Sequence, residues 1–137
     1  MLRQPWIAFA AFFGATAVAA AAYTAHGLGF IEDLAARETT RVILHTAVQQ
    51  QFFHALALLG VGVLSLRAEP KRWLLASGIL FTVGIVLFSG LIYFRVFTGV
   101  QTLRFFVPWG GVCLMLGWAA LGIAGTKLAG KARGWSV

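Results

Sequence analysis

The stretch WLLASGILFTVGIVLFSGLIYF, residues 73–94, contains no charged side chain and decides the fold class of this chain. A hydrocarbon core about 30 Å thick is crossed by about 20 residues of α-helix at about 1.5 Å per residue, so this run is long enough to span a bilayer. Three further runs without a charge occupy residues 4–31, 42–66 and 105–126. A soluble domain of this size has no use for four such stretches, so the sequence predicts an integral membrane protein.

The composition indicates one membrane domain. Of the 137 residues, 60% are hydrophobic and only 11% are charged, which leaves too little polar surface to solvate a globule. We expect a single domain over residues 1–137, an all-α, up-down bundle of four transmembrane helices at about 6–25, 44–66, 73–94 and 105–126. The formal charge of +7 does not indicate nucleic-acid binding, because the basic residues are scattered between apolar runs rather than gathered on one face.

The distribution of the basic residues predicts the orientation in the membrane. Seven of the 11 Lys and Arg residues lie before the first span, between the second and third spans or after the fourth span. Because the excess of positive charge normally stays inside, we expect both termini on the cytoplasmic side. Trp6, Trp73 and Trp135 are expected at the inner interface and Trp109 near the outer one. The first apolar run exceeds the core of a cleaved secretion signal, about 7–15 residues, so we expect it to remain as an anchor.

Two further expectations concern the first half of the chain. The loop from Gly27 to about Leu44 mixes charged and apolar residues, which favours a short amphipathic helix on the outer surface, with Thr39 or Thr40 as the cap of the second span. The first span is rich in alanine and contains Gly14, so its backbone can approach neighbouring helices closely. We therefore expect it to be central in the bundle or tightly packed.

Neutral polar residues in the outer halves of the spans form a candidate intramembrane cluster. Alternate spans run in opposite directions, so the end of span one, the start of span two and the end of span three all lie at the outer face. Gln51 and His54 are three residues apart and therefore share a face of the second helix. One interpretation is interhelical hydrogen bonding, worth about 0.6 kcal/mol per bond. The alternative is an outward-facing polar pocket that binds or transports a small solute or a lipid. The candidate residues are His26, Gln51, His54, Ser89 and Tyr93.

Other chemistries have weaker support in the sequence. A haem held by two histidines would require His26 and His54 to meet, but they lie at different depths in the membrane. A metal site made of these histidines and Cys113 is chemically possible, although no metal-binding spacing accompanies it. A proton relay normally uses intramembrane Asp or Glu, and the four runs contain neither. We therefore predict no catalytic residues, no metal and no cofactor, and a protein that is not an enzyme.

The third loop carries a basic pair. Arg95 and Arg104 bracket this loop, where they can contact lipid headgroup phosphates or an acidic partner, or simply be solvated.

Four local patterns, in this order along the chain, resemble a known family. They are Ala25-His26-Gly27-Leu28 in span one, Gln51-Phe52-Phe53-His54-Ala55-Leu56 in span two, Leu87-Phe88-Ser89-Gly90 with Tyr93 in span three, and Pro108-Trp109-Gly110-Gly111 with Leu116-Gly117-Trp118 in span four. The chain is similar to the small four-helix membrane proteins of domain-of-unknown-function family 423, whose eukaryotic branch is called transmembrane protein 256. The resemblance implies a multi-pass protein of the bacterial inner membrane and no established activity.

The expected function follows from packing. Alanine and glycine faces, together with many phenylalanines, suit contacts with other helices and with lipid. We expect an accessory or structural subunit that packs against a larger membrane complex of the respiratory or photosynthetic type, or against a second copy of itself.

Overall fold

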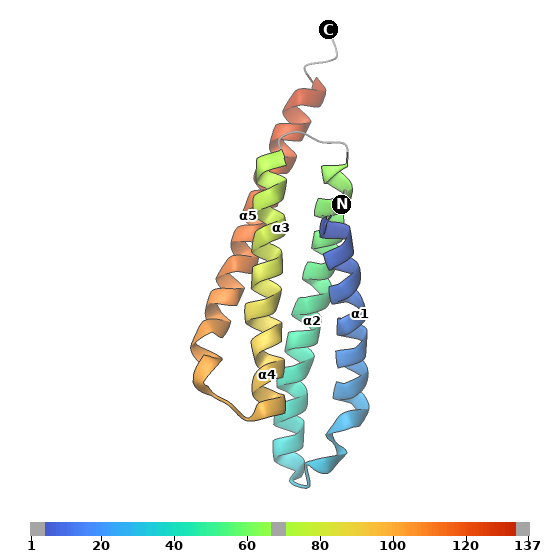
Figure 1. Ribbon diagram of the computed structural model, residues 1–137, viewed down its shortest axis with the longest axis vertical. Helices are drawn as coiled ribbons and strands as arrows, with labels where there is room; N and C mark the ends of the chain where they lie inside the picture. Colours follow the sequence, from blue (N-terminus) through green and yellow to red (C-terminus); the bar gives the residue numbers. More distant parts are fainter. Residues whose placement is uncertain (1–4, 67–70, 134–137) are drawn as a thin grey trace.

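A computed structural model describes residues 5–66 and 71–133 as a bundle of long helices (Figure 1). Arg3, Arg67 and Trp135, which entered the predictions above, lie outside the described residues. The elements are α1 (Pro5–His26), η1 (Gly27–Phe30), α2 (Leu34–Ser65), α3 (Lys71–Ile85), η2 (Val86–Gly90), α4 (Leu91–Thr98), η3 (Thr102–Phe106) and α5 (Val107–Arg133).

Four helical segments are long and apolar enough to cross a membrane. They are Pro5–Phe30, Leu34–Ser65, Arg72–Thr98 and Thr102–Leu128. Within residues 5–66 and 71–133 the structure contains helices and turns but no strand. The predicted all-helical class with four spans is therefore confirmed. The start of α1 and the end of α5 lie at the same end of the bundle (Figure 1).

The four spans form a row in which α1 and α5 are the outer members (Figure 1). The main helix pairs are α1 with α2 and α3 with α5, and the contact of α2 with α3 joins the two pairs. In its most apolar 18-residue window, α1 has 22% of its residues buried, against 50% for α2. The first span is therefore not central, but it packs closely against α2, in keeping with the other half of the expectation. Alanine permits a close approach, but α1 packs mainly against α2 and meets the third span through Trp6 and Tyr23.

The second span begins earlier than predicted. Asp33 caps α2, because its carboxylate oxygens accept hydrogen bonds from the backbone N–H groups of Ala35 (3.2 Å) and Ala36 (3.1 Å). The hydroxyls of Thr39 and Thr40, the predicted caps, instead donate to carbonyls one turn back within the helix, each at 2.9 Å. The loop residues predicted as a separate surface helix form η1 and the first turns of α2. No glycine or proline between residues 34 and 59 interrupts that helix.

The tryptophans differ in their environments. Trp6, expected at the interface, is buried, and a Cβ at Gly78 of α3 would lie 2.5 Å from its Cε2 atom. The missing side chain of Gly78 thus provides the slot in which Trp6 packs. Trp73 behaves as an end anchor, with the Lys127 Nζ atom 5.3 Å and the Arg72 guanidinium carbon 6.0 Å from its ring centroid.

The third span changes its winding part-way. Between α3 and α4 the residues Val86–Gly90 form a π-helical turn, η2, which the hydrophobic pattern did not predict. Single π-helical turns inside α-helices are rare and frequently lie at functional sites. Val86 and Gly90 of this turn are among the residues that line the cavity described next.

Candidate functional site

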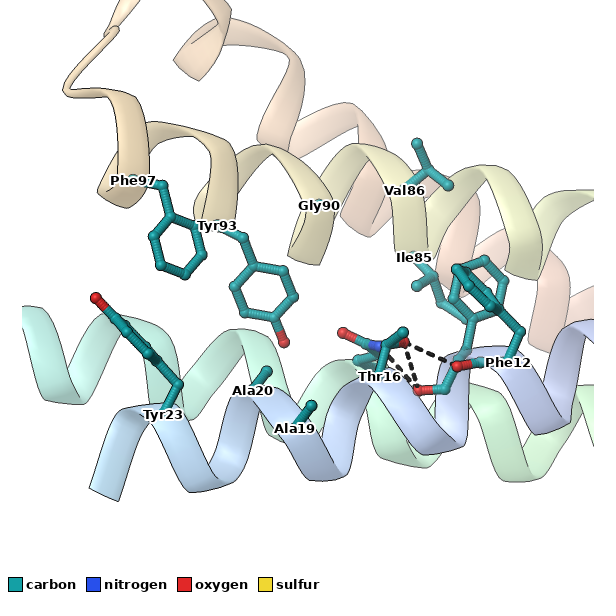
Figure 2. A pocket seen from close by; sticks show the side chains of 12 residues that line it. Phe12, Thr16, Ala19, Ala20, Tyr23, Ile85, Val86, Gly90, Tyr93 and Phe97 are labelled. Atoms are coloured by element: carbon teal, nitrogen blue, oxygen red, sulfur yellow. Dashed lines mark hydrogen bonds between the residues drawn. The ribbon is translucent and has the colours of Figure 1, made fainter. Parts of the chain in front are cut away.

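A cavity of about 440 Å³ lies between α1 and the third span (Figure 2). It is open to the surroundings on one side, and its volume falls within the range of small-molecule pockets, about 300–1,000 Å³. Its lining consists of Phe12, Phe13, Thr16, Ala19, Ala20, Tyr23, Gln51, Ile85, Val86, Gly90, Tyr93 and Phe97.

Small residues between aromatic ends create the space. Figure 2 shows Ala19 and Ala20 of α1 on one wall and Gly90 of η2 on the other. At one end the rings of Tyr23 and Phe97 meet with their centroids 5.0 Å apart. Phenylalanine side chains of α1 close the other end. The space lies between these two ends, bordered by Ala19, Ala20 and Gly90 and partly entered by the Tyr93 ring (Figure 2).

The polar groups that line the cavity differ in whether they have hydrogen-bond partners. The Gln51 amide Nε2 donates to the carbonyl oxygen of Phe13 and to the hydroxyl of Thr16, both at 2.8 Å. The Thr16 hydroxyl in turn donates to the carbonyl oxygen of Phe12 at 2.9 Å. The Tyr93 hydroxyl is buried and has no hydrogen-bond partner among the described residues. In Figure 2 the Tyr93 ring extends from α4 toward Ala19 and Ala20. The wall of the cavity therefore contains one unpaired hydroxyl, whose oxygen is covered by its neighbours.

His54 lies on another face of α2, against α3 and α5. The Trp118 indole Nε1 donates to His54 Nε2 at 3.1 Å, and His54 Nδ1 is 2.7 Å from the Gln50 carbonyl oxygen. Since an indole can only donate, Nε2 is the acceptor and Nδ1 carries the proton of a neutral imidazole. The ring also packs on Phe81 and Trp118, with centroids 5.6 and 6.1 Å away. The sequence did not predict the pairing with Trp118, because only the tertiary packing of α2 and α5 around Phe81 of α3 brings these side chains together.

The five candidate residues therefore separate into groups. Gln51 and Tyr93 line the cavity, whereas His26, His54 and Ser89 are not among its lining residues. The Ser89 hydroxyl donates to the Ala47 carbonyl oxygen at 2.8 Å and so joins η2 to α2. His26 is exposed at the end of α1. The predicted convergence holds for two of the five, while His54 and Ser89 form interhelical hydrogen bonds.

The remaining candidates lie at the end of the bundle opposite the chain termini or in the fourth span (Figure 1). Arg95 is half-buried in α4, and Arg104 is exposed in η3. Cys113 is a free, half-buried thiol on α5. Within the described part of the chain, no group of three or more His, Cys, Asp or Glu residues is arranged to hold a metal ion.

The fold defines the class as a small all-helical membrane protein with four spans. Residues 20–111 match the family described as "Protein of unknown function (DUF423)", and the chain belongs to this family. It is 37% identical over 119 residues to a UPF0382 membrane protein of Staphylococcus aureus, covering 83% of this chain and 88% of the relative. It is 32% identical over 131 residues to the UPF0382 inner membrane protein YgdD of Escherichia coli, covering 96% of both chains.

A Haemophilus influenzae UPF0382 membrane protein is 30% identical over 126 residues, covering 92% of this chain and 97% of the relative. No solved structure matches the chain. The family, the inner-membrane relative and the four apolar helices together identify a multi-pass protein of the inner membrane.

Proposed function

We propose that this chain is a non-enzymatic accessory subunit of a larger membrane assembly, and that α1 is the helix through which it docks. One observation carries the proposal: an outward-facing alanine stripe on α1. Successive members are three or four residues apart, so they lie on one face of the helix. The stripe consists of Ala8, Ala11, Ala15, Val18, Ala22 and Ala25, all of them exposed.

A second exposed stripe in the same chain gives the contrast. Along the third span the outward residues at similar spacing are large and apolar, with exposed fractions between 40% and 52%: Leu75, Ile79, Val83 and Val86. Bulky aliphatic side chains suit contact with lipid tails. Small residues instead allow two helix backbones to approach, and in membranes they are enriched where helices pack. The alanine stripe thus has the composition of a helix-packing face that this chain leaves uncovered.

The surface beside the stripe supports the same proposal. A groove of about 220 Å³ runs between α1 and α2 and is lined almost entirely by apolar atoms. Gly14 contributes to it, and a Cβ built there would meet nothing within 4 Å. A large side chain from a docking helix could therefore enter this groove. The groove residues are Ile7, Ala10, Ala11, Gly14, Phe52, Ala55, Leu56 and Leu59.

The proposed arrangement places both termini on the cytoplasmic side, in keeping with the excess of Lys and Arg in the segments that flank them. The docked partner is a transmembrane helix of a larger complex, of the respiratory or photosynthetic type. A second copy of this chain is the alternative partner.

Purification of the tagged full chain from its own membranes in mild detergent tests the proposal. We expect the chain in an assembly of constant stoichiometry. Ala15→Leu, at the middle of the stripe, should release it, because the added side chain prevents the close approach of the helices. Ala119→Leu at an exposed position of α5 is the matched control and should leave the assembly intact. Recovery of the wild-type chain only as a lone, monodisperse protein, or an assembly indifferent to Ala15→Leu, would refute this function.

A further inference from the structure

We propose that the cavity between α1 and the third span binds one acyl chain of a bilayer lipid, with the ester carbonyl of that chain accepting a hydrogen bond from the Tyr93 hydroxyl. This inference goes beyond docking and does not depend on it. The cavity uses the face of α1 that carries Thr16, Ala20 and Tyr23, whereas the alanine stripe lies on a different face of the helix.

The shape of the cavity selects a chain-like apolar ligand. Three of its lining residues, Phe12, Ala19 and Val86, are exposed and belong to helices long and apolar enough to span the membrane. In a bilayer the cavity therefore meets lipid tails rather than the aqueous phase. The ring pair of Tyr23 and Phe97 covers the end nearest the α1–η1 junction. Most of the remaining lining is alanine, glycine, aliphatic or phenylalanine, which offers an acyl chain an apolar surface without a charge. A lipid tail can therefore enter sideways, where water is scarce.

The Tyr93 hydroxyl supplies the polar contact once its ring turns toward the bound chain, because its oxygen is covered in the structure. A buried hydroxyl without a hydrogen bond is costly in an apolar medium. Its depth suits an ester carbonyl. Tyr93 lies five residues before the end of α4 at Thr98, about 7.5 Å along the helix axis. The interfacial layer of a leaflet is about 5–7 Å thick, and ester carbonyls lie at its inner boundary.

Gly90 has no side chain to fill the cavity, so a substitution at this position can be used to fill it. Its backbone angles, φ −60° and ψ −44°, are those of an ordinary helix, so any L-residue can adopt them. A Cβ built there has only the Ile85 carbonyl oxygen within reach, at 4.0 Å. A larger side chain at position 90 should therefore enter the cavity without forcing the helices apart. The matched control is Gly122 on α5, where a Cβ would meet nothing within 4 Å.

The first experiment uses the full chain in vesicles of phosphatidylethanolamine and phosphatidylglycerol with a trace of ester-linked phosphatidylcholine that carries a photoreactive diazirine on one acyl chain. After illumination, peptide mass spectrometry locates the adducts. We expect them to concentrate on residues 12–23 and 85–97. Gly90→Leu should lower their yield there at least tenfold, whereas Gly122→Leu should leave the yield unchanged. Even labelling around the bundle, or equal yields in the two variants, would overturn the proposal.

The second experiment tests the hydrogen bond. An unlabelled ester-linked phosphatidylcholine should displace the photoreactive lipid about fivefold better than its ether-linked analogue, the equivalent of about 1 kcal/mol for one hydrogen bond. Tyr93→Phe keeps the ring and removes the donor, so the two competitors should become equal. An ester preference that persists in Tyr93→Phe, or is absent from the wild type, would show that the carbonyl is not bound as proposed. Neither result bears on the docking of α1, which is measured separately by purification.

Discussion

Two adjacent glycines in α5 allow a matched test of how tightly the third and fourth spans pack. A Cβ built at Gly110 would lie 2.5 Å from the backbone nitrogen of Phe88 and 2.8 Å from the carbonyl carbon of Leu87. A Cβ built at Gly111 would come no closer than 3.9 Å to the Phe88 ring, which is an ordinary contact. Gly110→Ala should therefore push α5 away from η2, whereas Gly111→Ala should fit.

The expected difference in stability follows from comparing the two variants with each other. Each exchange gains about 1 kcal/mol of helix propensity, and this gain cancels in the difference. Only Gly110→Ala carries the overpacking penalty, typically about 1–3 kcal/mol. The penalty cannot be relieved by rotating a side chain, because two of the nearest atoms belong to the backbone of η2. We expect Gly110→Ala to be less stable than Gly111→Ala by about 1–3 kcal/mol.

Unfolding in mixed micelles with increasing sodium dodecyl sulfate, followed by circular dichroism, measures this difference. Because η2 also forms one wall of the cavity, Gly110→Ala should change the photolabelling of residues 85–97 as well. Unfolding free energies of the two variants that agree within about 0.5 kcal/mol, or a more stable Gly110→Ala protein, would refute the close crossing of α5 and η2.

Three further predictions address other parts of the molecule. A double-mutant cycle of His54→Phe and Trp118→Phe, measured by the same unfolding assay, should give a coupling energy of about 0.6 kcal/mol and at most about 1.7 kcal/mol. A coupling energy of zero would contradict the indole–imidazole hydrogen bond. Gly99 ends α4 with φ +71°, so Gly99→Ala should lower the unfolding free energy of the protein by about 1–2 kcal/mol. An unchanged unfolding free energy would mean that the left-handed turn is not maintained in the membrane. Reporter domains fused to each end of the chain should both be active in the cytoplasm, whereas activity on opposite sides would be incompatible with four spans.

The main features of the fold could be predicted because hydropathy along the chain is a local property. Each long run without a charge had to become a helix, since a helix satisfies its own backbone groups in lipid. The start of α2 was misjudged for a local reason as well. Asp33 stands directly before a long run without glycine or proline, and it is a better cap than a threonine already inside the helix.

Which residues meet at a site depends on how each helix is rotated about its own axis. A membrane sequence specifies this rotation weakly, because the lipid and the protein interior are both apolar. Trp6 could be an interfacial or a core residue until the packing showed its slot at Gly78. His54 and Gln51 share a stretch of α2, yet one meets Trp118 and the other meets α1. The family resemblance marked these residues without indicating which of them would meet.

The amino-acid sequence by itself determined that this protein lies in a bilayer, crosses it four times and belongs to a family of small membrane proteins, because a long uncharged run has one stable form in lipid. Only the tertiary structure decided the order of the helices in the row, the exposure of the α1 alanines and the cavity at Tyr93. These features arise from contacts between residues far apart in the chain, and small residues such as Gly90 and Ala20 act there through the space they leave unfilled.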